Sequence, residues 1–528
     1  MTFATIAASA VVALVSRVSG GPGPSVADLA VGLVAAATVI YIVVIGYRAI
    51  LAWAAQNARV IAFTGDDLAA IPDHALPVYS ILVPLYREAG VLPTLIAKLS
   101  GLDYPTDRLQ VLLLIEQDDE TTRAALNRIH LDSRFEVVLI PPSLPRTKPK
   151  ACNVGLPHVR GEFCVIFDAE DRPEPDQLRK AVAAFRTLPS WVVCVQAELQ
   201  YWNPWTNWLT RCFAAEYALH FSLVLRGFDW LRLPIPLGGT SNHFRADALR
   251  VVGAWDPYNV TEDADLGMRI ARRGWRVRMM TSVTEEEANA RMGSWIRQRS
   301  RWIKGYYQTW LVHMRSPRQL WRDLGAWQFI GFQLTFGFAA LTGLLNPVFW
   351  FLTCVYIVSG PAHISRLFPA AVLYLGVLSL LVGNLMMMYS MMAGCMDRGL
   401  FAAVRTMLAI PLYWALMSVA AYKALIQLIR PSRRHYWELT QHGLVTDGAE
   451  PIVTTATPQR QPNVPQPEKS HRGVLEPAFS RWQATQSAPP LSSFPPAAAT
   501  SALRPGRRAE RRHSRQPRRL PGRSRAAS

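Results

Sequence analysis

The sequence predicts an α/β domain inserted between transmembrane α-helices, followed by a disordered basic tail. Three observations predict this architecture. Residues 75–290 contain short β-rich apolar runs that alternate with helix-like stretches. Charge-poor runs long enough to cross a membrane lie on both sides of that region, within residues 1–60 and 324–430. Residues 448–528 are rich in Pro, Ser, Ala and Gln, with few apolar residues, which is typical of disorder.

The composition also indicates more than a soluble domain. The chain has 528 residues, 50% of them hydrophobic, and a slightly positive mean hydropathy. Its formal net charge is +18, but about half of this surplus lies between Arg504 and Arg525, where ten arginines accompany one acid, Glu510. A basic disordered tail below a membrane favours contact with anionic lipid, or a solvated spacer, over nucleic acid. The cysteines lack metal-binding spacing, and we expect free thiols at Cys152, Cys164, Cys194, Cys212, Cys354 and Cys395.

The first predicted span is Leu29 to Tyr47, which carries no charge and is followed by Arg48 and Arg59. These cations mark its cytoplasmic end. Residues 2–16 are apolar but shorter, and form either a second span or an interfacial segment. The sequence therefore predicts one or two N-terminal spans and a cytoplasmic domain after them.

About four spans are predicted in residues 324–430. Residues 324–365 contain no Asp, Glu, Lys or Arg, which is enough for two passes joined by a tight turn at Asn346-Pro347, or for one span and a re-entrant segment. Residues 367–396 and 399–422 are each predicted to form one further span. Cations after the last run favour a cytoplasmic end, although the loop with Arg398 and Arg405 does not fit that topology.

Acidic residues follow two of the predicted strands. Fully apolar strands indicate a sheet covered on both faces, with its ligand site at the carboxyl ends. One acidic group, at residues 116–119, follows the second strand, and another, at residues 168–171, follows the fourth. The expected strands are Tyr79–Leu85, Val111–Ile115, Phe135–Ile140, Phe163–Phe167 and Trp191–Gln196.

The second acidic group predicts a metal site. Asp168, Glu170 and Asp171 would repel one another unless a cation lies among them. Carboxylate oxygens together with phosphate oxygens suit Mg²⁺ or Mn²⁺. The alternative is a polar turn with a helix cap, because Asp171 and Glu174 precede a helix-like stretch at residues 177–185.

Two further motifs complete the pattern. Thr261-Glu262-Asp263-Ala264-Asp265 precedes an amphipathic stretch and could be only a helix cap. Gln298-Arg299-Ser300-Arg301-Trp302 lies in a basic, tryptophan-rich segment, residues 291–323, which is typical of an interfacial amphipathic helix.

In this order, the four features resemble the family 2 glycosyltransferases, especially their membrane-bound cellulose-synthase-like and hyaluronan-synthase-like branch. The resemblance runs from about Tyr79 to Trp310 and implies a GT-A-like nucleotide-sugar domain. The family's D-x-D metal motif corresponds to Asp168-Ala169-Glu170-Asp171, so its second Asp is Glu here unless the frame moves to Asp171. The metal ligands would then be Asp168 with Glu170 or Asp171.

The resemblance also implies the donor-binding residues. Asp118 or Asp119 would bind the uridine end. Lys150, with Asn153 beside it, would lie near the diphosphate, in preference to Lys148. Asp168 would act on the donor through the metal.

The resemblance implies that Asp263 is the general base of an inverting displacement, with Glu262 as its catalytic neighbour. Proton removal from an attacking sugar hydroxyl needs such an acceptor. Arg301 suits the leaving diphosphate because its planar fork matches phosphate oxygens. Trp302 offers a flat face to an acceptor ring, and Gln298 could bind either partner.

The Gly238-Gly239-Thr240 turn resembles an acceptor-side loop of the family, with a plain turn as the alternative. Residues 431–447 form a cytoplasmic juxtamembrane segment in which Tyr436–Gly443 would serve as an interfacial anchor or as a lid.

The leading hypothesis is a processive enzyme that adds sugar from a UDP-sugar, first UDP-glucose, to a β-linked polysaccharide and passes it across the membrane. One alternative transfers a single sugar to a membrane lipid. Another is an inactive scaffold, which the retained acids disfavour. A transporter is disfavoured because the spans lack the ionisable residues that mark a pathway. We expect a multi-pass protein of a bacterial inner membrane with a cytoplasmic catalytic domain.

Overall fold

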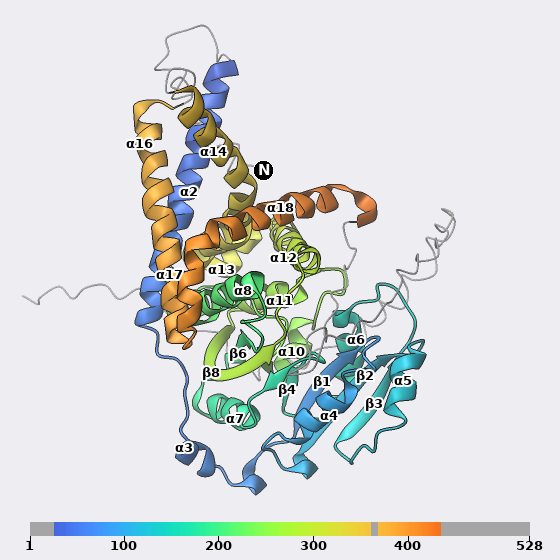
Figure 1. Cartoon of the computed structure of the whole chain (residues 1–528). Helices are drawn as coiled ribbons and strands as arrows, with labels where there is room; N and C mark the ends of the chain where they lie inside the picture. Colours follow the sequence, from blue (N-terminus) through green and yellow to red (C-terminus); the bar gives the residue numbers. More distant parts are fainter. Residues whose placement is uncertain (1–25, 361–367, 434–528) are drawn as a thin grey trace, which may run out of the picture.

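The computed structural model describes residues 26–360 and 368–433. In space, an α/β domain forms one end of the described structure, and a group of long apolar helices forms the other end (Figure 1). The expected segments at residues 2–16, 436–443 and 448–528 lie outside the described residues.

The domain is built on one mixed sheet of eight strands in the order β3-β2-β1-β4-β7-β6-β8-β5. The first four strands in this order are parallel, β7 is antiparallel to β4 and β6, and β6 is parallel to β8. The strand bounds are β1 Tyr79–Leu85, β2 Leu109–Glu116, β3 Phe135–Ile140, β4 Phe163–Ile166, β5 Arg172–Pro173, β6 Val192–Tyr201, β7 Asn242–Arg245 and β8 Arg276–Glu286.

Helices cover both faces of the sheet, as the apolar strands predict. Leu112 and Leu114 of β2 pack in one core cluster with α6, α10 and α11, whereas Val111 and Leu113 pack in another with α4 and α7. This alternation follows from the two-residue period of a strand. The helices of the domain are α3 Gly65–Ala69, α4 Leu92–Ser100, α5 Glu120–Leu126, α6 Lys148–Gly155, α7 Gln177–Thr187, α8 Trp208–Leu219, α9 Arg226–Trp230, α10 Ala246–Val252 and α11 Glu262–Arg272.

Three of the five expected strands differ in their bounds, and three strands were missed. Strand β3 is an edge strand with Val137 and Leu139 exposed, so full burial was wrong for it. Strand β7 was missed because its sequence is polar. His243 of β7 is nevertheless buried, because it bonds to the Tyr79 hydroxyl at 2.7 Å and to Gln177 at 3.2 Å.

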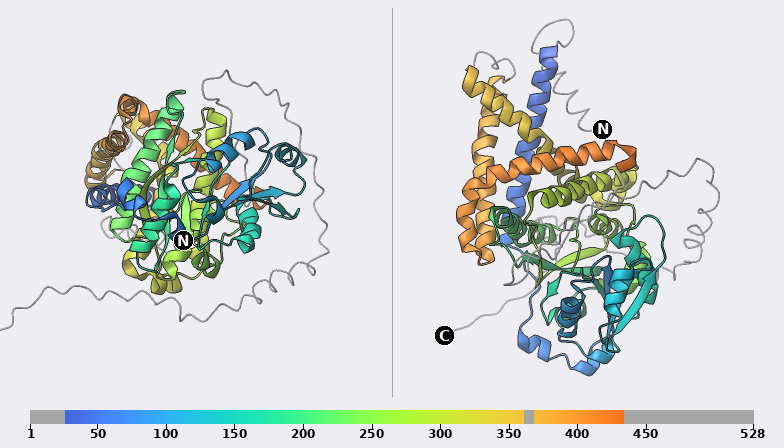
Figure 2. Two further views of the ribbon diagram at one scale, coloured as in Figure 1. Left: turned by 90° about the horizontal axis from the view of Figure 1, so that it is seen from below. Right: turned by 45° about the vertical axis from the view of Figure 1, so that its right-hand side comes forward.

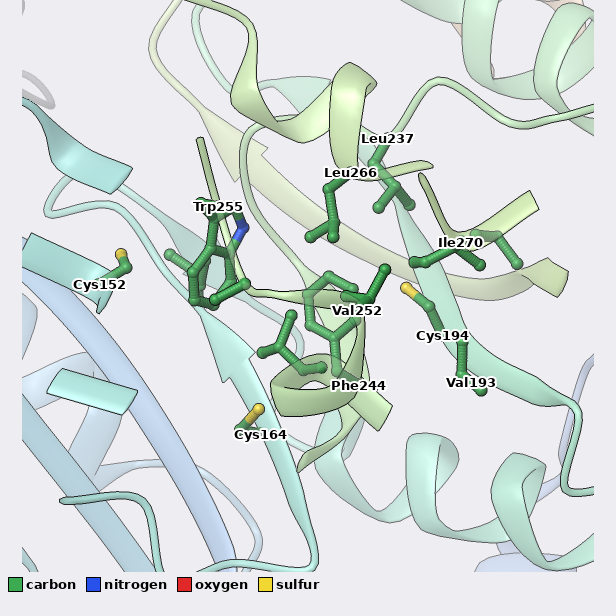
Figure 3. Packing of buried hydrophobic residues seen from close by; sticks show 14 of the residues in the cluster. Cys152, Cys164, Val193, Cys194, Leu237, Phe244, Val252, Trp255, Leu266 and Ile270 are labelled. Atoms are coloured by element: carbon green, nitrogen blue, oxygen red, sulfur yellow. The ribbon is translucent and has the colours of Figure 1, made fainter. Parts of the chain in front are cut away.

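The core between β7, β4, β6 and α11 contains the aromatic rings of Phe244 and Trp255 (Figure 3). Cys152, Cys164 and Cys194 lie in the same cluster. All six cysteines fall within the described residues and are free thiols, as expected.

Beyond the domain, α12 (Met292–His313) and α13 (Pro317–Phe332) lead into the apolar helices. Within residues 26–360 and 368–433, four helices have the length and composition to cross a membrane: Ala30–Gln56, Leu341–Val358, Ala370–Asp397 and Phe401–Ile429. The corresponding elements are α2 Val26–Gln56, η5 Gln333–Phe338, α14 Ala339–Ser359, α16 Ala370–Leu378, η7 Ser379–Gly383, α17 Asn384–Asp397, η8 Phe401–Ala409 and α18 Ile410–Ile429.

The expected turn at Asn346-Pro347 was wrong, because Pro347 lies inside the continuous helix α14. The chain bends instead at Gly325 in α13, where φ is 70° and ψ is 173°. Glycine tolerates this left-handed φ without steric cost. Residues 324–359 therefore contain one candidate span rather than two.

Helix α18 lies across α2, α14 and α16 instead of along them (Figures 1 and 2). Near its start, the Tyr413 hydroxyl donates to Glu216 of α8 at 2.5 Å. Just after its end, the Arg433 carbonyl accepts from Lys304 of α12 at 3.3 Å. Both ends of α18 thus contact the layer formed by α8 and α12.

Arg398, which the sequence topology left unexplained, lies at the end of α17 against the α/β domain. Its guanidinium donates to Glu198 of β6 at 2.8 Å and to the Leu199 carbonyl at 3.1 Å. The end of α17 is therefore on the same side as the catalytic sheet.

Candidate active site

Lys148, Asp168 and Gly239 meet at the carboxyl end of β4. Asp168 follows this strand, Lys148 begins α6, and Gly239 precedes β7. The Lys148 Nζ atom lies 2.5 Å from Asp168 Oδ1 and donates to the Gly239 carbonyl at 2.7 Å. Burial opposes the charge of the ammonium, but Asp168 and Glu262 outweigh it and raise the pKa of Lys148. The charged form of Lys148 is therefore favoured in this site despite its burial.

Asp263 and Glu262 form the first turn of α11 and face the same space. A Cβ atom added at Gly239 would lie 3.5 Å from Asp263 Oδ2 and 3.9 Å from Lys148 Nζ. Glycine at 239 thus keeps the space beside the carboxylate open. Asp263 Oδ1 accepts a hydrogen bond from the Ala264 amide at 2.7 Å.

The pKa values of the two acids of this turn are raised to different extents. Burial, followed by the charge of Asp263, raises the pKa of Glu262 to about 8. Burial also raises the pKa of Asp263, but only to about 6, because the Ala264 amide and then Lys148 favour its charged form. Burial thus raises the pKa of both acids, while the Ala264 amide and Lys148 favour the charged form of Asp263.

The predicted metal ligands all follow β4 in the sequence, and each has a different environment. Asp171 Oδ2 accepts from the Asp168 amide at 2.6 Å and from the Thr240 hydroxyl, whereas its Oδ1 is buried without a hydrogen-bond partner. Burial, then the charges of Asp168 and Glu170, raise the pKa of Asp171. Asp168 and Glu170 are both partly exposed.

Two acids that the sequence analysis did not identify, Glu88 and Glu286, belong to the same cluster. Burial, then repulsion by the acids after β4, raises the pKa of each, and Glu88 Oε2 is a second buried oxygen without a hydrogen-bond partner. Within residues 26–360 and 368–433, no three His, Cys, Asp or Glu side chains are gathered closely enough to hold a metal. The excess of carboxylates and their oxygen-only chemistry nevertheless fit a hard divalent cation.

Lys150 does not approach this cluster. Its ammonium lies 3.0 Å from both carboxylate oxygens of Glu116 and also donates to the carbonyls of Pro141 and Ser143. Both partners of this ion pair are nearly fully buried. Lys148, and not Lys150, is therefore the lysine that contacts Asp168, and diphosphate binding by Lys150 stays a prediction.

The two candidate uridine-binding acids have separate environments. Asp119 caps α5 through the Thr122 amide at 3.2 Å and accepts from the Arg87 amide at 2.5 Å. Asp118 is 41% exposed and pairs with Arg146 at 2.6 Å. Of the two, Asp118 has the accessible carboxylate.

Helix α12 brings Arg301 to the acids of α11. The charges of Glu262, Asp263 and Asp168 all act on Arg301, although burial lowers its pKa overall. Gln298, in contrast, is buried and accepts a hydrogen bond from the side-chain amide of Asn289 at 2.9 Å. The QRSRW segment therefore directs its second arginine toward the catalytic turn.

Trp302 packs in an aromatic cluster with Phe213 and Tyr217 of α8. The Arg299 guanidinium lies 4.5 Å from the centre of its ring. Arg299 also donates to both oxygens of Glu216, at 3.0 and 2.6 Å, an ion pair that the sequence analysis missed because nothing in the motif marks its partner. Acceptor binding by Trp302 stays a prediction.

The chain matches the family model described as Glycosyl transferase family group 2 over residues 163–419. Among curated proteins, it is 28% identical over 291 residues to the beta-monoglucosyldiacylglycerol synthase of Synechocystis sp., covering 53% of this chain and 58% of that protein. It is also 28% identical over 218 residues to the glucomannan 4-beta-mannosyltransferase 1 of Oryza sativa subsp. japonica, covering 40% of this chain and 42% of that protein.

Among solved structures, a mannosyltransferase from Pyrobaculum calidifontis in complex with GDP-Man and Mn²⁺ aligns with a TM-score of 0.43 at 19% identity. The alignment covers 74% of this chain and 98% of that one. The chain spans about half the length of the curated relatives it matches, from 42% to 58% for the two named.

Proposed function

The chain belongs to the family 2 glycosyltransferases, and we propose that it transfers a sugar, with inversion, from a nucleotide-sugar to a membrane lipid. Its α/β domain is the GT-A-like domain that the sequence resemblance implied, and the expectation of an enzyme is confirmed. In the proposed reaction, the acceptor hydroxyl oxygen bonds to the anomeric carbon, the bond to the diphosphate breaks, and the hydroxyl proton passes to Asp263.

The observation that supports this assignment is the position of Asp263, whose Oδ2 atom lies next to Gly239 and close to Lys148. The pKa of Asp263, which burial raises to about 6, still lies below neutral pH. A general base must be deprotonated at the working pH. We therefore assign the base to Asp263, and Glu262 beside it acts on Lys148 and Arg301 through its charge.

The donor is proposed to lie along the carboxyl ends of the strands. Asp118, which is accessible, would bind the nucleoside, and Lys148 and Arg301 would face the diphosphate. Two cations near the leaving group stabilise the negative charge that develops there. This proposal moves the diphosphate contact from Lys150, which is held by Glu116, to Lys148.

Asp168, Asp171 and Glu170 would hold Mg²⁺ or Mn²⁺ together with the diphosphate oxygens. When bound, the cation would neutralise the charge of the departing diphosphate. The buried Asp171 Oδ1, which lacks a hydrogen-bond partner, supports this proposal.

The position of α18 favours a lipid acceptor over a polysaccharide channel. Both of its ends contact the layer of α8 and α12, so we propose that α2, α14 and α16–α17 cross the membrane while α18 lies at its surface. Three spans in the described chain provide few helices to line a channel. The end of α17 at Glu198 then returns the chain to the side of the domain, which we place in the cytoplasm of a bacterial inner membrane.

Polysaccharide elongation is the second candidate, favoured by the similarity to the glucomannan mannosyltransferase. To separate the two, full-length protein in nanodiscs would be supplied with diacylglycerol and with labelled UDP-glucose first, then other UDP-sugars and GDP-mannose. The proposal expects a labelled product that enters organic solvent and carries one sugar. High-mass carbohydrate that stays in water would instead establish elongation.

A further inference from the structure

A groove of about 650 Å³ lies between α14 and α18, away from the catalytic turn in the sequence and formed by different residues. Its apolar wall includes Pro347 and Trp350 from α14 and Val419 and Ile426 from α18. A largely apolar cavity of this size is large enough for a lipid chain.

The groove continues into an apolar stripe along the outer side of α18. Val419 is 52% exposed and Ile426 is 49% exposed, and one helical turn separates Ile426 from the exposed Ile429. The opposite side of the helix, with Ala420, is buried. A surface helix that exposes an apolar stripe is suited to lie in the lipid interface.

One end of the groove is cationic. Lys423, Arg430 and Arg433 are among its lining residues, and no Asp or Glu of the part of the chain that the structure describes lines it. A neutral diacylglycerol has no charge to meet these cations. A lipid with an anionic headgroup complements both the apolar wall and the cationic end.

We propose that this groove binds an anionic glycerophospholipid of the bilayer, with an acyl chain between α14 and α18 and its phosphate at Arg430 and Arg433. The bound lipid would join the span α14 to the surface helix α18. Lys304 of α12 donates a hydrogen bond to the Arg433 carbonyl. The bound lipid would therefore also stabilise α12, the helix that carries Arg301. None of the residues that line this groove belongs to the candidate active site, and the proposal does not depend on the identity of the sugar.

Native mass spectrometry of the full-length protein, released from nanodiscs of phosphatidylcholine with phosphatidylglycerol, tests the proposal. Wild type should retain phosphatidylglycerol in preference to phosphatidylcholine. Arg430→Gln/Arg433→Gln should lower that retention by roughly tenfold or more, as expected for the loss of two cations near a lipid phosphate. Arg322→Gln/Arg405→Gln is the matched control, since it removes two exposed arginines that do not line the groove.

A second variant keeps the charges. Val419→Trp fills the groove from an exposed position and should also displace the lipid. Equal retention by wild type and the Arg430/Arg433 variant, or no preference between the two lipids, would overturn the proposal.

The occupant is identified by a photo-crosslinking residue placed at position 350. It should attach to phosphatidylglycerol. Attachment to residues 1–25 of the same chain, or to a second copy, would show that protein fills the groove and would also overturn the proposal.

Discussion

Gly305 of α12 lies directly against Thr261, the residue before the catalytic acids. A Cβ atom at position 305 would stand 2.3 Å from Thr261 Oγ1 and 2.7 Å from its Cβ. The glycine therefore permits α12 to approach the start of α11, and this approach brings Arg301 near Asp263. The sequence motif ends three residues earlier, at Trp302, and gives no sign of this requirement.

Gly305→Ala should lower the transfer rate by about a hundredfold, because helix and turn must separate and small displacements of reacting groups are costly. The variant should still fold, which circular dichroism would check. Gly293→Ala is the control on the same helix, since its Cβ would meet only Arg297, at 3.8 Å. Equal rates for the two variants would show that the spacing is unimportant.

Asp263→Asn should reduce transfer by about 10²- to 10⁴-fold, because the amide keeps the volume and loses the basicity. Nucleotide binding, measured by calorimetry, should be nearly unchanged. Glu262→Gln serves as the comparison and should retain far more activity, because burial raises the pKa of Glu262 and so favours its protonated form. If the Gln variant were the more damaged one, the base would have been assigned to the wrong acid.

The acid limb of the pH profile should lie near pH 6. Burial raises the pKa of Asp263 from its ordinary value of 3.8 to about 6, so the base is lost at a higher pH than for an exposed aspartate. Below pH 6, kcat should fall by about tenfold for each pH unit, as expected for one required deprotonated group. A profile that stays flat down to pH 4 would mean that Asp263 is not the base or is not buried in the working enzyme.

The apolar runs were sufficient to predict an α/β sheet. Strands β1 and β3 have the predicted bounds because both consist mainly of residues with high strand propensity. The polar strand β7 was not predictable, since its burial depends on partners such as Tyr79 that are remote in sequence.

Helix α18 shows a different limit of the sequence. Its composition suits a membrane span, and only the contacts of Tyr413 and of the Arg433 carbonyl show that it lies along α12. Hydropathy records how apolar a helix is, but it does not record what the helix packs against.

Chelation of divalent cations should abolish transfer, and Mg²⁺ or Mn²⁺ should restore it. The acids after β4 supply only oxygen donors, and the diphosphate would complete the site. Calorimetry gives a second readout, because nucleoside diphosphate should bind more weakly in EDTA. Asp168→Asn should reproduce both effects. Unchanged turnover in excess EDTA would place these acids in a structural role.

The last prediction separates the two lysines of α6, whose roles could not be read from sequence. Residues two apart on a helix point to nearly opposite sides, so Lys148 reaches Asp168 while Lys150 reaches Glu116. Spacing alone does not say which side faces the site.

Lys148→Gln should lower kcat by about 10²- to 10³-fold, because it removes a positive charge beside the leaving diphosphate. Its melting temperature with bound metal and nucleotide should stay close to that of wild type. Lys150→Gln should instead reduce the free energy of unfolding by about 3–5 kcal/mol, because the buried Glu116 carboxylate loses its partner. The protein that remains folded should keep most of its kcat. The reverse pattern, a stable but inactive Lys150 variant, would return the diphosphate contact to Lys150.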